Sequence, residues 1–218
     1  MKERNEFTRT LETAALSLML AIGWTTVAAA QAGVKQAENL VKKTEASAKA
    51  ITEAREQIKT TLDGYNALIE GNVEDTKKAY GNLQKEMDRS DDRAEDVGKR
   101  IDEMNVEADK YFADWTRSLD GISSPDLRAR SEERMKDARS RYDQILATTG
   151  KAGDMFASFI QNLRDQVTYL GHDLNPRALA SLEGDATKLN TAAESFFGKI
   201  DSAIDEATSY AASLRPQP

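Results

Sequence analysis

The sequence predicts an all-α protein, built as an elongated antiparallel four-helix bundle or coiled coil. The 218 residues include only four prolines and 6% aromatic residues, while 31% are charged. This composition is typical of long helices. Beyond residue 33, apolar or small residues recur at alternating steps of three and four, which is the pattern of a buried helix seam.

Four periodic runs with short breaks between them give the expected helices. Ser124-Pro125 and Asn175-Pro176 each place a capping side chain before a proline at the first helical position. Short breaks of this kind make successive helices antiparallel neighbours. We therefore expect a single helical-bundle domain over residues 33–214, followed by a tail at 215–218, with helices over about 34–69, 73–119, 125–170 and 176–214.

The first 32 residues have the pattern of a signal peptide. Basic residues within the first nine positions precede an apolar run over 14–30, which ends in the small-residue stretch VAAAQA. Cleavage there would remove residues 1–32, and we expect an exported, periplasmic protein of the cell envelope. The alternative is an uncleaved anchor in the inner membrane, although the run is shorter than the roughly 20 apolar residues of a spanning helix.

The net charge and the absence of cysteine limit the kinds of partner and of chemistry that the chain can have. The net charge of −7 disfavours nucleic acid, which needs a basic surface, and is unfavourable for direct binding to an anionic membrane. The chain has no cysteine, so thiol catalysis, disulfides and cysteine-based metal sites are excluded. We expect no cofactor, and a partner that is another envelope protein or a second copy of this chain.

The ionisable residues form no catalytic or metal-binding motif. Tyr169 stands three residues before His172, the single histidine, whereas a di-iron bundle needs glutamate at that position. The carboxylate-rich stretch 88–103 is interleaved with Arg and Lys, which is typical of a solvated, ion-paired helix face. A loose calcium site at Asp91, Asp92 and Glu95 lacks EF-hand spacing. We predict that the chain is not an enzyme; an enzyme or metal carrier that uses His172 is the minor alternative.

Hairpin geometry predicts how the last two helices lie side by side. Folding the chain about residue 173 sets Gly150 opposite Phe197. Each glycine within a helix costs roughly 1 kcal/mol of stability relative to alanine, which a packed ring would offset. We therefore expect the ring of Phe196 or Phe197 to pack over Gly150.

The same geometry, with the second hairpin folded about residue 122, makes the tip at 111–132 project beyond the first and fourth helices. The tip is rich in apolar side chains. It either covers these side chains itself or presents them as an apolar surface to a partner or to a second copy. Its candidate interaction residues are Tyr111, Phe112, Trp115, Leu119 and Ile122.

Three stretches carry a family resemblance: RIDEMNVEADKYFADW, SPDLRARSEERMKDARSRYDQIL and, most specifically, LRDQVTYLGHDLNPRALASLEG. The segment over about 88–214 resembles an exported bacterial helical family defined only as a domain of unknown function. The resemblance implies an exported coiled-coil protein without known catalytic residues. Tyr169, His172 and Arg177 belong to the most specific stretch, and helix capping does not require them. They form a second group of candidate interaction residues.

Together these patterns favour a non-enzymatic exported envelope protein, a rigid helical scaffold or adaptor that acts through protein–protein contacts. The alternative is a bundle that interacts with lipid or with a membrane through the projecting tip at 111–132. No catalytic, cofactor-binding or metal-binding residue is expected.

Overall fold

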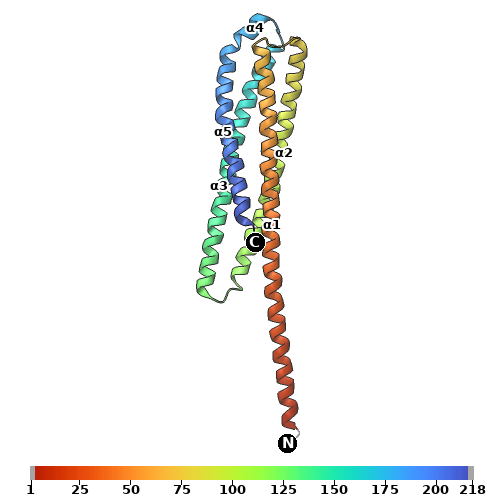
Figure 1. Cartoon of the computed structure of the whole chain (residues 1–218), viewed down its shortest axis with the longest axis vertical. Coiled ribbons are helices and arrows are strands. Elements are labelled where there is room, and N and C mark those ends of the chain that lie inside the picture. Colours follow the sequence, from red (N-terminus) through yellow and green to blue (C-terminus); the bar gives the residue numbers. More distant parts are fainter. Residues whose placement is uncertain (1–2, 216–218) are drawn as a thin grey trace.

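The computed structural model describes the backbone of residues 3–215 and the side chains of residues 33–215 (Figure 1). The described part is all-α and contains no strand. This confirms the fold class predicted from the composition and the helix seam. In order along the chain, the helices are α1 (Glu3–Ile69), α2 (Thr76–Leu119), α3 (Pro125–Leu170), α4 (Pro176–Ser181) and α5 (Glu183–Leu214).

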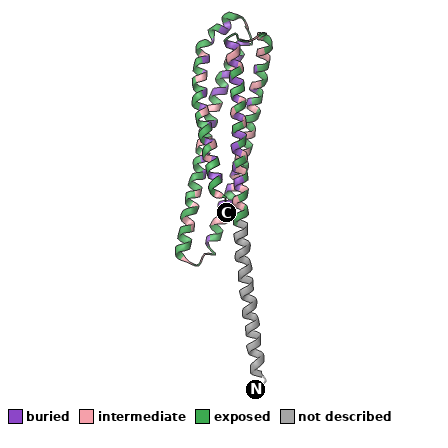
Figure 2. Ribbon diagram, in the orientation of Figure 1, coloured by how far each residue is buried: buried purple, intermediate pink, exposed green. Residues whose placement is uncertain are grey.

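The four long helices pack around a common core as an antiparallel bundle. α1 packs against α2 and α5, and α3 packs against the same two helices, so the four form a closed ring. The short helix α4 crosses the end of the bundle between α3 and α5 (Figure 1). Buried residues, drawn purple, recur along all four long helices (Figure 2).

The expected signal peptide or anchor at 1–32 and the last three residues of the tail lie outside the described side chains. Within the part of the chain that the structure describes, no helix combines the length and the apolar character needed to cross a membrane.

A glycine in left-handed conformation ends α1. Gly71 has φ +70°, and the backbone N–H of Asn72 donates to the carbonyl of Ala67 at 3.0 Å. The N–H of Gly71 donates to the carbonyl of Leu68, which completes a Schellman motif. α2 then begins at Thr76 rather than at the expected residue 73, because the side chain of Asp75 accepts from a backbone N–H and caps the helix there.

The expected proline caps are present at α3 and α4. Ser124 and Asn175 have extended backbone, and each side chain accepts from the backbone N–H three residues further on. Pro125 and Pro176 occupy the first helical positions. Proline is favoured at this position because its missing N–H would have no helical partner.

The fourth expected helix, over 176–214, is divided at Leu182. The N–H of Leu182 donates to the carbonyl of Leu179 at 3.0 Å, the three-residue spacing of a tighter turn. The side chain of Leu182 is 7% exposed and belongs to the core. Burial of this side chain turns the chain direction, so α4 belongs to the corner and only α5 pairs with α3.

This corner shifts the register of α3 and α5. The ring of Phe159 stacks on Phe196, with ring centroids 6.0 Å apart, so the hairpin is centred near residue 177 and not 173. Gly150 and Gly153 are exposed, and a Cβ added at either would have no neighbouring atom within 4 Å. The expectation that Phe196 or Phe197 packs over Gly150 is therefore wrong.

The core consists of two apolar clusters, one in each half of the bundle. The cluster nearer α4 is the larger, and the other surrounds the C-terminal end of α5. Fully buried large side chains include Tyr65, Leu83, Leu163, Leu170 and Phe196 in the first cluster, and Leu40, Met104 and Tyr142 in the second.

Replacing Gly150 or Gly153 by alanine should stabilise the protein. Both lie within α3 in open space, so alanine gains helix propensity without a clash, and we expect each to raise the free energy of unfolding by roughly 1 kcal/mol. Urea unfolding measures the change. Gly71→Ala is the matched control and should lower stability, because its φ of +70° strains any residue with a Cβ. A loss of stability in the α3 variants would contradict the observed register.

Candidate functional site

Buried hydroxyl groups lie in the contact between α1 and α2. The Oγ of Ser47 lies 3.0 Å from the carbonyl oxygen of Arg100, and the Oγ1 of Thr61 lies 3.0 Å from that of Glu86. Thr61 Oγ1 is also 2.9 Å from the Oγ of Ser90. All three hydroxyl residues are at most 2% exposed. A side chain this short reaches the opposite backbone only where two helices approach closely, so these bonds fix the separation and register of α1 and α2.

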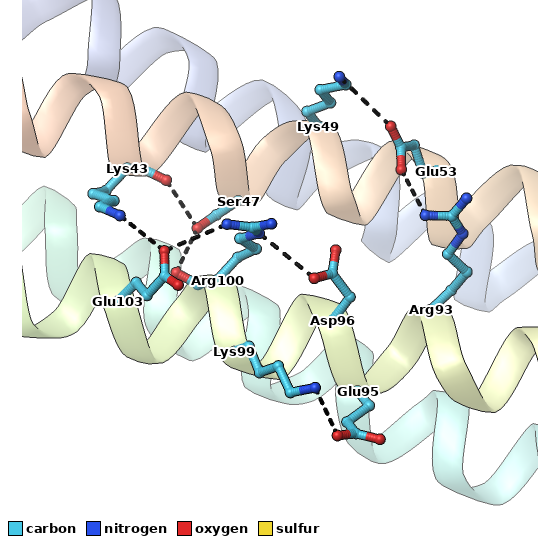
Figure 3. Close-up of polar contacts among 10 residues, drawn as sticks. All are labelled: Lys43, Ser47, Lys49, Glu53, Arg93, Glu95, Asp96, Lys99, Arg100 and Glu103. Carbon is cyan, nitrogen blue, oxygen red and sulfur yellow. Dashed lines mark hydrogen bonds and ion pairs between the residues drawn. The ribbon is translucent and has the colours of Figure 1, made fainter.

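Ion pairs flank this contact on the solvent side (Figure 3). Lys43 on α1 lies 2.9 Å from Glu103 on α2, and Arg93 on α2 lies 2.9 Å from Glu53 on α1. The hydrogen bond from Lys43 holds the pKa of the Glu103 carboxyl below its ordinary value. Exposed pairs of this kind individually contribute little to stability. The buried hydroxyls therefore set the register, and the ion pairs only support it.

Within α2, pairs four residues apart occupy the carboxylate-rich stretch. Lys99 lies 2.8 Å from Glu95, and the hydrogen bond between them lowers the pKa of Glu95 and raises that of Lys99. Asp91, a ligand in the calcium alternative, accepts from Arg164 on α3 at 2.7 Å. In the described residues, no group of three or more His, Asp or Glu side chains is placed to hold a metal ion.

The tip at 111–132 turns its aromatic side chains inward. Tyr111, Phe112 and Leu119 are at most 9% exposed, and Trp115 and Ile122 are half-buried. Tyr111 contacts both Phe112 and Trp115 edge to face, with ring centroids 5.2 and 5.5 Å apart. The tip therefore covers most of its own apolar surface.

A polar contact across the tip assists this packing. The indole Nε1 of Trp115 on α2 donates to the Oγ of Ser131 on α3 at 2.9 Å. A half-buried tryptophan needs such a partner for its N–H, and the bond ties the two helices of the tip together. The sequence gives no signal for this pair, because neither residue belongs to a recognisable motif.

The second group of candidate residues is exposed at the opposite end of the bundle. Tyr169 is 52% exposed, and its hydroxyl lies 3.4 Å from the Oγ of Ser181 on α4. His172 and Arg177 are exposed, and no hydrogen bond or ion pair within the described residues involves either side chain. The corner thus presents an aromatic ring, an imidazole and a guanidinium to solvent.

Gly171 allows a close contact at this corner. Its φ of −60° is ordinary helical backbone, so the glycine is not needed as a left-handed helix stop. A Cβ at this position would lie 2.6 Å from the hydroxyl of Tyr80 on α2. Tyr80 is the residue that sequence reasoning missed, since only the folded bundle brings it next to Gly171.

The two candidate groups are not brought together. The tip and the corner lie at opposite ends of α3, whose 46 residues span about 69 Å at 1.5 Å per residue. Each end must be considered as a separate contact surface.

The fold and these surfaces define a class: an elongated antiparallel four-helix bundle with an inward-packed aromatic tip at one end and an exposed polar corner at the other. Residues 27–214 match the family described as protein of unknown function, DUF2959, and the chain belongs to this family. The match confirms the resemblance to a helical family of unknown function and extends it beyond residues 88–214. No curated protein and no solved structure matches the sequence.

Three tyrosines, Tyr65, Tyr142 and Tyr210, are buried in the core, and burial raises the pKa of each above the ordinary value. Tyr142 donates to the Oδ1 of Asn105 at 2.5 Å. The hydroxyl of Tyr210 is buried and has no hydrogen-bond partner among the described residues. The two phenols therefore occupy similar apolar surroundings but differ in hydrogen bonding.

The difference in hydrogen bonding predicts how the phenylalanine variants behave. The burial of the phenols predicts how stability depends on pH. Tyr210→Phe should raise the free energy of unfolding by about 1 kcal/mol, whereas Tyr142→Phe should lower it by a similar amount. Above about pH 10 the unfolded chain releases phenolic protons that the folded chain retains, so stability should fall as pH rises. Urea unfolding at neutral and alkaline pH measures both effects. An equal loss of stability in the two variants would contradict the assignment.

Proposed function

We propose that the protein is a non-enzymatic exported protein of the cell envelope, which acts as a rigid helical scaffold or adaptor through contacts with other proteins. The observation that carries the proposal is the way in which the helices are tied together along the whole bundle. Export to the periplasm rests on the signal-peptide pattern of residues 1–32.

Cross-helix bonds near both ends and in the middle support a rigid body. Near α4, Asn66 on α1 and Asn190 on α5 exchange two side-chain hydrogen bonds of 2.8 and 3.0 Å. In the middle, Arg55 on α1 lies 2.7 Å from Asp201 on α5. At the other end, Asn39 donates to Glu107 on α2. A bundle tied at these levels can hold two contact surfaces at a fixed separation.

The exposed corner is the surface where we place contact with another protein. Tyr169, His172 and Arg177 combine an aromatic face with hydrogen-bond donors, and tyrosine and arginine are enriched among residues that dominate binding energy. Their side chains have no role in the core, so the fold does not need them. Variants of these three residues can therefore test binding without disturbing the fold.

The membrane alternative requires the tip to present apolar side chains. Tyr111, Phe112 and Leu119 are buried there, and a membrane would bind them only after α2 and α3 separate at the tip. The net charge of −7 also opposes adsorption to anionic lipid. These two observations favour the scaffold proposal.

Replacing the three corner residues together by alanine tests the proposal. Tyr169→Ala, His172→Ala and Arg177→Ala should change the free energy of unfolding by less than about 0.5 kcal/mol, because all three side chains are exposed. The full chain with these changes should lose a protein that the unmodified chain captures from envelope extract. A control with Ser195→Ala, Lys199→Ala and Thr208→Ala, all exposed on α5, should capture it normally.

Identical capture by the corner variant and the unmodified chain would contradict a contact at this corner. Flotation of the full chain with anionic vesicles is the second arm. Flotation that Trp115→Ala abolishes would favour the membrane alternative instead. Substrate turnover that His172→Ala abolishes would contradict the non-enzymatic role.

A further inference from the structure

The middle of α2 contributes little to the apolar core. Between Met87 and Met104, a fully described stretch of about 25 Å, α2 buries no apolar side chain. Most of this stretch is the carboxylate-rich segment 88–103, in which eleven of the sixteen residues are charged. Its apolar residues on the helix seam are only half-buried; they are Ala94, Val97 and Ile101. Burial therefore holds this part of α2 weakly.

The part of α3 beside this stretch is also poorly buried. Over the described residues 146–155, Ala152 is the one buried residue. The other two long helices are well buried nearby, since α1 buries five apolar residues over 48–58 and α5 buries four over 196–207. The two apolar clusters of the core meet at this level. The seam between α2 and α3 is thus the loosely packed side of the bundle.

Polar contacts join α2 and α3 only at the two ends of this stretch. Arg164 on α3 donates to Asp91 on α2 at 2.7 Å, and Tyr142 on α3 donates to Asn105 on α2 at 2.5 Å. Between these two levels, no hydrogen bond or ion pair joins the side chains that the structure describes on α2 and α3. Over the same length α1 binds α2 through ion pairs and a buried hydroxyl (Figure 3). This part of α2 is therefore held on its α1 side.

Three glycines lie in the unjoined stretch. Gly98 on α2 and Gly153 on α3 are halfway between the two polar contacts, and Gly150 is one turn from Gly153. All three are exposed inside a helix, and a Cβ added at any of them would have no atom of the described chain within 4 Å. Close packing therefore does not require glycine here. Each glycine shifts the equilibrium between bent and straight helix roughly fivefold toward bending, relative to alanine.

We propose that α2 and α3 separate locally at this level, over about residues 92–103 and 146–155, while both ends of the bundle stay closed. The helices bend at the glycines, which breaks backbone hydrogen bonds there and opens the seam. Water then reaches the inner faces of α1 and α5. The fold thus contains a conformational device in the middle of one seam.

The contacts of α3 with α5 limit the extent of this opening. The ring of Tyr142 packs against Tyr210 below the unjoined stretch, and the ring of Phe156 packs against Phe196 above it. Between these two contacts α3 can bend outward while its ends stay in place. Because α2 and α3 bury few side chains there, the opening requires less free energy than unfolding of the whole bundle.

The local opening goes beyond the proposed function and does not rest on it. The cross-helix bonds that support the scaffold all involve α1, and they tie it to α2 and α5. They stay intact when α3 bends outward, so the tip and the corner keep their separation. A seam that does not open would leave the corner proposal intact, and a corner that binds nothing would leave the opening intact.

Thiol labelling of single-cysteine variants tests the opening, because the chain has no cysteine of its own. Ala203 and Ala193 are both 1% exposed on α5. Ala203 lies midway between Phe196 and Tyr210, whose ring contacts with α3 place it at the level of Gly150. Ala193 lies about one turn from Phe196 in the direction of the corner, outside the unjoined stretch. The two alanines are therefore a matched pair.

A maleimide should modify Ala203→Cys chains at least tenfold faster than Ala193→Cys chains under native conditions. The rate at position 203 should change little in urea below the unfolding transition, because a local opening exposes little surface. Equal rates at the two positions overturn the proposal. A rate at position 203 that rises with urea as steeply as global unfolding does also overturns it.

Alanine in place of glycine provides the sharper test. Gly150→Ala should slow the modification of Ala203→Cys chains roughly fivefold, because alanine opposes bending of α3. The matched control is Gly184→Ala, at an exposed position in open space on α5 near the corner, which should leave that rate unchanged. If modification occurs only through global unfolding, the two alanines slow it equally, and that result overturns the proposal.

Amide hydrogen exchange of the unmodified full chain gives an independent readout that needs no variant to fold. The amides of residues 92–103 and 146–155 should exchange at least tenfold faster than those of residues 47–55 on α1. The bond between Ser47 and the carbonyl of Arg100 places this part of α1 at the same level. Equal protection of the three segments overturns the proposal.

Discussion

The rest of the bundle depends on the close contact of α1 and α2, which the buried hydroxyls of Thr61 and Ser90 hold in register. Two polar groups at 0% exposure are tolerated because both are hydrogen-bonded: their hydroxyls bond each other, and Thr61 Oγ1 also lies 3.0 Å from the carbonyl oxygens of Glu86 on α2 and Gln57 on its own helix. A slip of one residue would separate Ser90 from its partner on α1 and leave Thr61 with only the carbonyl of Gln57 in its own helix. This register sets which face of α1 meets α5, and it places Tyr80 of α2 against the Gly171 corner.

Most of the helical architecture could be predicted from the sequence, because the seam and the caps are local signals. Ser124, Asn175 and the two prolines after them define helix starts from neighbouring residues alone. The register of α3 and α5 could not be predicted, because it depends on where burial of Leu182 turns the chain. The reason for glycine at Gly171 is also non-local, since Tyr80 is ninety-one positions away.

The candidate surfaces also differ in how far the sequence predicts them. In the sequence, Tyr169, His172 and Arg177 are singled out because helix capping does not require them. The structure exposes all three side chains to solvent. Apolar composition alone suggests that the tip exposes an apolar surface. In the structure the aromatic rings turn inward, and the hydrogen bond between Trp115 and Ser131 ties the two helices of the tip together, so most of that surface is covered.

A double-mutant cycle on Thr61 and Ser90 tests the central claim most directly. Thr61→Val, Ser90→Ala and the double variant are compared with the unmodified chain by urea unfolding. If the two hydroxyls stabilise the α1–α2 register through each other, the cycle should give a coupling energy of about 1 kcal/mol or more. Changes that add within about 0.3 kcal/mol would show independent sites and contradict the account.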